Sequence, residues 1–195
     1  METDAADVIT VVSGLPRSGT SMMMKMLEAG GLPVLTDKQR AADEDNPRGY
    51  YEYEPVKALE TDQAWLPAAR GKVVKIISAL LRHLPQDERY RVVFMRRDID
   101  EVLASQRQML IRRGRPADRT ADAKMAELFE RHLADVQRRL DSSDAFAVLY
   151  LSYDEVLGEP GRCVARINEF LGGGLDEAGM ALAIEPALHR QRGGR

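Results

Sequence analysis

The chain has 195 residues, of which 44% are hydrophobic and 30% charged, and its formal net charge at pH 7 is -3. This balance is typical of a folded globular protein and excludes wholesale disorder, so we expect a single domain over residues 1–195. A slightly negative chain has no overall field that would draw it onto nucleic acid or an anionic membrane, so any anion site must be local.

The cysteine count and the hydropathy pattern bear on the compartment. Cys163 is the only cysteine, so neither an intrachain disulfide nor a cysteine-based zinc site can form. The acidic segment 1–7 lacks the basic and apolar regions of a signal peptide. No apolar run approaches the roughly 20 residues of a membrane span. We therefore expect a cytoplasmic protein with no membrane or nucleic-acid partner.

Apolar runs and turn residues predict alternating strands and helices along the chain. Buried strands are expected at 8–12, 32–35, 72–77, 91–95 and 145–151. Helices are expected at 20–29, 55–60, 98–112, 121–140 and 160–171. Strands that alternate with helices build a parallel sheet with helices on both faces. The predicted fold class is therefore α/β, in three layers, with a central parallel sheet of about four to five strands.

Two longer segments have clear patterns. Residues 36–53 show no helical or strand period and are rich in Asp, Glu, Asn, Pro and Gly, which predicts a long loop of functional interest. The helix at 121–140 carries a stripe of apolar side chains at helical spacing, which predicts a face buried in the core. The stripe consists of Met125, Leu128, Phe129, Leu133, Val136 and Leu140.

The glycine turn (residues 14–21, Gly-Leu-Pro-Arg-Ser-Gly-Thr-Ser) lies between the first strand and the first helix. In this order of elements, backbone N–H groups and the helix dipole converge on one point and form an anion site. Gly14 and Gly19 have the spacing of the Walker pattern G-x-x-x-x-G-K-[ST], but Thr20 stands where that pattern requires Lys. The sequence therefore predicts a P-loop fold that binds nucleotide phosphates here, with Arg17 as the cation.

The run Pro16-Arg17-Ser18-Gly19-Thr20-Ser21 resembles the 5′-phosphosulfate loop of the sulfotransferases, which has the form P-[KR]-[ST]-G-[ST]-[ST]. That family uses 3′-phosphoadenosine 5′-phosphosulfate (PAPS) as the donor and needs no metal. The resemblance implies that these residues bind the donor. It also implies an enzyme that moves a sulfuryl group from PAPS to a hydroxyl of an acceptor, such as a small molecule.

A second motif follows the strand at 91–95. Arg97 and Ser105, eight residues apart, resemble the family's 3′-phosphate motif, in which an Arg at a strand end and a Ser on the next helix bind the 3′-phosphate of PAPS. Arg97 would supply charged donors at the carboxyl edge of the sheet, and Ser105 a hydroxyl two helical turns further on. One departure is Ile99, which stands where the family frequently carries Pro.

Two later segments extend the resemblance. Residues 148–157, with Pro160 and the run 170–172, resemble the family's late "YEdL..dP...FLG" segment, which is mostly structural. Residues 189–194 resemble its final R-K-G-x-x-G nucleotide loop only faintly. The resemblance therefore runs from Val8 to Gly172.

Sulfuryl transfer requires cations that stabilise charge on the bridging oxygen of the donor, and a base that removes the proton of the acceptor. Arg17 and Lys75 can serve the first need. Cytosolic relatives carry Lys-x-His on the strand of Lys75, and Ile77 stands at the position of that histidine. His83, eight residues after Lys75, is one alternative base.

Carboxylates of the long loop are the other candidates for the base, because other branches of the family use a carboxylate. The loop offers Asp37, Glu44, Asp45, Glu52 and Glu54. Asp37 lies close to the place where the tyrosylprotein branch carries its Glu, and Glu52 follows Gly-Tyr-Tyr, a plausible wall for an acceptor pocket. Asp37 and Glu52 are our joint candidates, and the sequence does not choose between them.

Two other functions stay open at this point. One is a P-loop nucleotide or small-molecule kinase, which is disfavoured because Thr20 occupies the lysine position. The other is a catalytically inactive nucleotide-binding protein of the same fold. The identity of the acceptor depends on loops, here 36–53 and 112–120, whose shape the sequence does not give.

Overall fold

A computed structural model describes residues 7–37, 51–112, 114 and 122–184. In this part of the chain, four parallel strands form one sheet in the order β2-β1-β3-β4. The strands are β1 (Ile9–Gly14), β2 (Val73–Lys75), β3 (Tyr90–Arg96) and β4 (Phe146–Ser152). The predicted α/β class with a central parallel sheet is confirmed.

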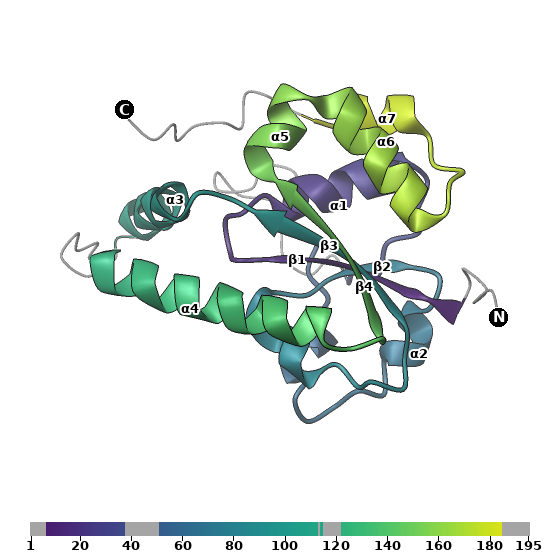
Figure 1. The fold of residues 1–195 in the computed structure, drawn as a ribbon, viewed down its shortest axis with the longest axis horizontal. Coiled ribbons are helices and arrows are strands. Elements are labelled where there is room, and N and C mark those ends of the chain that lie inside the picture. The colour runs from purple at the N-terminus through teal and green to yellow at the C-terminus, as the bar shows by residue number, and fades with distance from the viewer. Residues whose placement is uncertain (1–6, 38–50, 113, 115–121, 185–195) are drawn as a thin grey trace.

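Helices cover both faces of the sheet, with α1, α5, α6 and α7 on one face and α2 and α4 on the other (Figure 1). The helices are α1 (Thr20–Ala29), α2 (Leu66–Ala69), α3 (Ile99–Arg112), α4 (Asp122–Asp141), α5 (Tyr153–Gly158), α6 (Pro160–Leu171) and α7 (Glu177–Leu182). Two 3₁₀ helices are η2 (Glu54–Ala58) and η3 (Ser78–His83). None of the described helices is long and apolar enough to cross a bilayer.

The central strand β1 is buried along its whole length. It pairs with β2 on one side and with β3 on the other, and helices cover both of its faces. Side chains of neighbouring strands alternate between two cores, with Val11 and Val92 facing α4 and Val12 and Val93 facing α1. Burial on both faces explains the short, continuous apolar runs of the sequence. It also fixes the turn after β1 at the carboxyl edge of the sheet.

The segment 32–35 differs from its prediction, because it forms only an isolated parallel bridge between Val34 and Val73. The Val73 N–H donates to Pro33 O, and the Leu35 N–H donates to Val73 O, both over 2.8 Å. Pro33 has no N–H group, so the ladder cannot extend in its direction. The predicted second strand is therefore reduced to one pair of residues.

The stripe on α4 is only partly core. Val136 and Leu140 are buried, but Met125 is 39% and Leu128 46% exposed. Figure 1 shows the first half of α4 extending past the carboxyl ends of the strands, so no sheet lies beneath it. The prediction that the whole stripe is core was wrong for this half of the helix.

Gly19, at the start of α1, allows a test of the packing there, and Gly31, after the end of α1, serves as its matched control. Gly19 has φ 98° and Gly31 has φ 93°. A Cβ on Gly19 would lie 2.6 Å from Cδ2 of Tyr153, whereas one on Gly31 would meet no described atom within 4 Å. We predict that Gly31→Ala lowers the free energy of unfolding by about 1 kcal/mol from backbone strain alone. Gly19→Ala should cost about 1–3 kcal/mol more, because it also creates a clash.

Urea unfolding of both variants measures this difference. Equal losses in the two variants would show that Tyr153 does not pack against the turn as described.

Candidate active site

The glycine turn adopts backbone angles that few residues tolerate. Gly14 has φ 150°, Gly19 has φ 98°, and between them Arg17 has φ 74°. Ser18 is buried, and both its Oγ (2.7 Å) and its backbone N (3.1 Å) donate to Leu15 O, which closes the turn. A Cβ on Gly14 would lie 2.4 Å from Ser18 Oγ, so only glycine fits there. The turn directs the first N–H groups of α1 toward the carboxyl edge, where an anion can bind.

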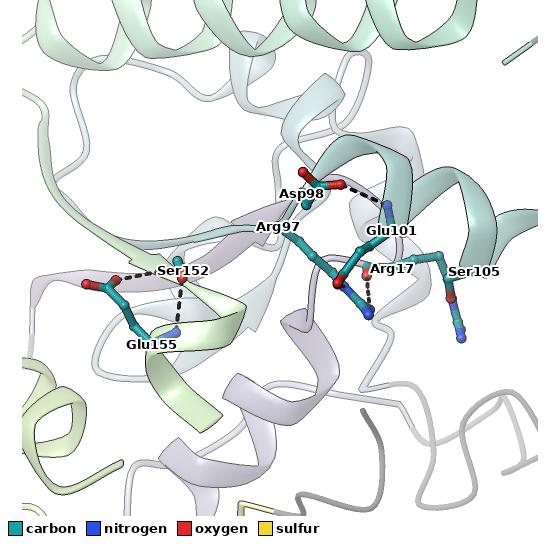
Figure 2. A network of polar contacts seen from close by, with 7 residues as sticks. All are labelled: Arg17, Arg97, Asp98, Glu101, Ser105, Ser152 and Glu155. Atoms are coloured by element: carbon teal, nitrogen blue, oxygen red, sulfur yellow. Dashed lines mark hydrogen bonds and ion pairs between the residues drawn. The ribbon is translucent and has the colours of Figure 1, made fainter. Parts of the chain in front are cut away.

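Arg17 and Ser105 lie together, although 88 residues separate them in the sequence. Arg17 Nε donates to Ser105 Oγ over 2.9 Å (Figure 2). Ser105 is buried on α3, and Arg17 is a non-glycine residue in the left-handed region. Such conformations cluster at functional sites, because the surrounding structure must enforce them. The side chain of Arg17 therefore bridges the glycine turn and α3.

Arg97 lies at the end of β3 with its side chain only 7% exposed. Its Nε is 2.9 Å from Glu101 Oε2, and its Nη1 donates to Arg17 O over 3.2 Å (Figure 2). Its guanidinium carbon lies 4.3 Å from the centre of the Tyr153 ring, a cation–π distance. Its buried Nη2 has no hydrogen-bond partner among the described residues. Buried donors are normally satisfied, so this nitrogen is suited to an acceptor that a ligand supplies.

Tyr153 reaches Arg97 because a capping box fixes the start of α5. Ser152 Oγ accepts from Glu155 N over 3.0 Å, and Ser152 N donates to Glu155 Oε2 over 3.1 Å (Figure 2). Burial raises the pKa of Tyr153, although Arg97 opposes this effect. The ring is therefore neutral at physiological pH and presents its face to the guanidinium.

Sequence reasoning missed Glu101, Tyr153 and α5. The spacing of Arg97 and Glu101 is the i,i+4 spacing of helical ion pairs, which could have indicated their contact. The run Ser-x-x-Glu at Ser152 and Glu155 matches the capping-box pattern, which could have indicated α5. No local signal links Tyr153 to Arg97, because their contact depends on the pairing of β3 with β4.

Lys75 lies on the other side of the glycine turn, at the end of β2. Its backbone pairs with Val12 of β1, and its Nζ is 3.5 Å from Ser21 Oγ in the first turn of α1. Thr20, at the position of the Walker lysine, is the first residue of α1, and Pro16 is exposed on the turn. The two strands that flank β1 thus each lead to a cation beside the glycine turn: Lys75 ends β2 and contacts Ser21, and Arg97 follows β3 and contacts Arg17 O.

The two candidate bases lie side by side. Asp37 N donates to Glu52 O over 3.2 Å, and Thr36 Oγ1 donates to the same carbonyl over 2.8 Å. The carboxylate of Asp37 also accepts a 2.6 Å hydrogen bond from Glu54 N, at the start of η2. Asp37 therefore has a structural role, whatever its role in chemistry. Of the other three loop carboxylates considered, Glu54 pairs with Lys57 Nζ at 2.6 Å, and Glu44 and Asp45 lie outside the described residues.

The register of the sheet places this carboxylate pair on the Lys75 side of the site. Val34 bridges Val73 in parallel, so the chain after Val34 continues beside β2 in the same direction, toward the carboxyl edge. Asp37, three residues after this bridge, and its neighbour Glu52 therefore lie on the side of the sheet that β2 forms.

The two histidines in the described part of the chain, His83 and His132, lie on the opposite face of the sheet from α1. His83 ends η3, on the way back to the start of β3, and its Nε2 accepts from Arg82 Nε over 2.9 Å. His132 of α4 lies 2.8 Å from Oγ of Ser78, the residue after Ile77. Burial lowers the pKa of His132. Ile77 itself is 43% exposed. Among the described residues, His83 contacts only residues near η3 and contacts neither Lys75 nor the glycine turn.

Comparisons with known proteins match nearly the whole chain. A model of the family described as the sulfotransferase domain matches residues 7–186. A comparison with curated protein sequences gives no match.

Solved structures give the same result for the fold. The sulfotransferase domain of the Synechococcus PCC 7002 olefin synthase superposes with a TM-score of 0.54 at 17% identity, covering 92% of this chain and 78% of that one. Mouse sulfotransferase SULT7A1 complexed with PAP gives 0.56 at 18% identity, covering 91% and 63%. This chain therefore spans less than two thirds of the mouse protein. The sulfotransferase from Alicyclobacillus acidocaldarius gives 0.53 at 19% identity, covering 92% and 87%.

The contact between Asp37 and Glu54 N generates a prediction about stability. Asp37→Ala should lower the free energy of unfolding by about 1 kcal/mol, because it removes a side-chain acceptor from the start of η2. Asp37→Asn should keep most of the stability, because its amide oxygen can still accept the bond. Urea unfolding of both variants tests this. An equal loss for Asn and Ala would mean that the charge, not the hydrogen bond, stabilises the loop.

Proposed function

The chain belongs to the sulfotransferase domain family, and on that premise we propose that it transfers a sulfuryl group from PAPS to a hydroxyl group of an acceptor. The observation that carries the proposal is the buried Nη2 of Arg97, a charged donor left for a ligand beside the glycine turn. One related structure, mouse SULT7A1, is described as a complex with PAP, the product of PAPS after transfer. A PAPS donor explains why one site would need two separate anion-binding parts.

The glycine turn would hold the 5′ end of the donor. Within residues 16–21, Gly19, Thr20 and Ser21 supply backbone N–H groups at the N-terminus of α1, which favours a phosphate or a sulfate. Arg97 and Ser105 would hold the 3′-phosphate, Arg97 through its Nη2 and Ser105 through its hydroxyl hydrogen. Ser105 Oγ accepts a hydrogen bond from Arg17, so its own O–H is available to donate. The two parts of the site are joined by Arg17.

Transfer requires a new bond between the acceptor oxygen and sulfur while the bond from sulfur to the bridging phosphate oxygen breaks. The electron pair of the broken bond remains on the phosphate oxygen, where cations stabilise it. Arg17 and Lys75 are the cations that we assign to this role, because Arg17 lies in the turn that leads into α1 and Lys75 contacts Ser21 in its first turn. With two side-chain cations there, we propose that transfer needs no metal. The proton of the acceptor goes to Asp37 or Glu52, which lie on the Lys75 side.

The acceptor that we propose is a small molecule with a hydroxyl group, with neither nucleic acid nor a membrane as a partner. The net charge of -3 supports this, because it gives no general attraction to polyanions. A cytoplasmic location is supported by the single cysteine, which is buried and has no partner for a disulfide within the chain. A kinase is disfavoured, because Thr20 begins α1 where NTP-binding kinases place lysine.

Arg97→Ala tests the assignment of the 3′-phosphate. We predict that the preference for 3′-phosphoadenosine 5′-phosphate (PAP) over adenosine 5′-phosphate falls by about one to two powers of ten, because a charge-assisted hydrogen bond contributes roughly 1.5–3 kcal/mol. Ser105→Ala should act in the same direction but less, because it removes a neutral donor. Titration calorimetry of both nucleotides measures the preference.

The matched control is Arg96→Ala. Arg96 is the exposed neighbour of Arg97, and its guanidinium lies over Tyr150 at 4.1 Å instead of at the glycine turn. Its replacement should leave the preference unchanged. If Arg97→Ala weakens both nucleotides equally, Arg97 does not bind a 3′-phosphate.

The carboxylates can be tested separately from donor binding. We predict that Asp37→Asn or Glu52→Gln lowers kcat by about 10²- to 10⁴-fold, the usual contribution of a general base, with little change in the Kd for PAP. Asn at position 37 keeps the acceptor for Glu54 N, so a loss of rate would not be a loss of fold. If both variants retain the full kcat with an acceptor that the native enzyme sulfates, neither carboxylate is the base.

A further inference from the structure

We infer that Glu101 is a positioning residue for the 3′-phosphate: its buried carboxylate fixes the guanidinium of Arg97 so that Nη2 is the nitrogen left for the ligand. The inference rests on the proposed function, because it concerns the same donor site. Glu101 lies between Arg97 and Ser105 in the sequence but is neither of the two residues to which the motif gives a role, and it enters the site only through the geometry of Arg97.

The contacts of Arg97 show how its orientation is set. Its Nε is bound to Glu101 Oε2 over 2.9 Å, and its Nη1 to Arg17 O over 3.2 Å, while one face lies against Tyr153. These contacts fix the position and the plane of the guanidinium and use two of its three nitrogens. The remaining nitrogen, Nη2, is the one without a partner in the described part of the chain.

Glu101 is itself held in place. The side chains of Glu101 and Arg97 are 9% and 7% exposed, so their ion pair is shielded from water. The backbone N of Glu101 donates to Asp98 Oδ1 over 3.1 Å, which fixes the residue in the first turn of α3 (Figure 2). A long side chain oriented before the ligand arrives loses less conformational freedom on binding. The carboxylate thus prepares Arg97 for one particular phosphate.

Simple electrostatics predicts the opposite effect. A carboxylate this close to Arg97 repels an incoming phosphate, so its removal should strengthen the binding of any anion. Positioning predicts instead that its removal weakens selectivity for the 3′-phosphate. Charge repulsion and positioning therefore predict opposite changes in the preference for PAP over adenosine 5′-phosphate. The ratio of these two affinities is the right measure, because general changes in charge or fold alter both affinities and cancel in the ratio.

The experiment measures the Kd of PAP and of adenosine 5′-phosphate by calorimetry for the native chain and three variants of Glu101. Glu101→Ala should lower the preference for PAP by about tenfold, the effect of roughly one hydrogen bond to a charged group. Glu101→Gln should stay within about threefold of the native ratio, because its amide oxygen can still accept from Arg97 Nε. Glu101→Asp keeps the charge but is one methylene shorter, so it should behave like Ala.

The matched control is Asp100→Ala, which removes the same charge from the same turn of α3 at an exposed position. It should leave the ratio unchanged. Thermal unfolding checks that each variant is folded. If Glu101→Ala does not fold, the PAP preference of Glu101→Asp is compared with that of Glu101→Gln instead.

Several outcomes would overturn the inference. If the preference for PAP over adenosine 5′-phosphate rises or stays constant in Glu101→Ala, the carboxylate serves charge balance and does not position Arg97. A loss of preference in Glu101→Gln equal to that in Glu101→Ala would lead to the same conclusion. A native chain with no preference for PAP overturns the proposed function together with this inference. A native preference that Arg97→Ala abolishes and Glu101→Ala leaves intact overturns the role of Glu101 alone.

Discussion

A buried guanidinium at the end of β3 is the constraint on which the arrangement of this site depends. An arginine taken out of water is costly unless partners surround it. Glu101 supplies the opposite charge, Tyr153 an aromatic face, and Arg17 a backbone carbonyl. These partners come from the starts of α3 and α5 and from the glycine turn. The contacts of Arg97 therefore hold these three segments together at one edge of the sheet. Its remaining nitrogen, Nη2, gives that edge an affinity for an anion.

The parts of the site that could be predicted from the sequence are those with local patterns. The β-branched run before Gly14 and the glycine spacing indicated a strand, a turn and a helix, and the structure has these elements. The direct contact between Arg17 and Ser105, 88 residues apart, was not predicted, but the meeting of the two motifs at one edge follows from simple rules. The two motifs each follow a buried strand, and the carboxyl ends of adjacent parallel strands meet at one edge.

The parts that could not be predicted depend on tertiary context. The segment 32–35 has the composition of a strand, but Pro33 restricts it to one bridge. The stripe on α4 has the right period, but periodicity does not show where the sheet beneath the helix ends, so Leu128 is exposed. The general base could not be chosen because Asp37 and Glu52 are neighbours through backbone bonds that no spacing rule reveals.

The central claim is that the site is built for a nucleotide with a 3′-phosphate and works without a metal. The most direct measurement is calorimetric titration of the native chain with PAP in the presence of EDTA, compared with ATP and magnesium. The account predicts that PAP binds more tightly than ATP with magnesium, and that EDTA does not weaken its binding. Tighter binding of ATP with magnesium than of PAP would contradict the account and favour a kinase.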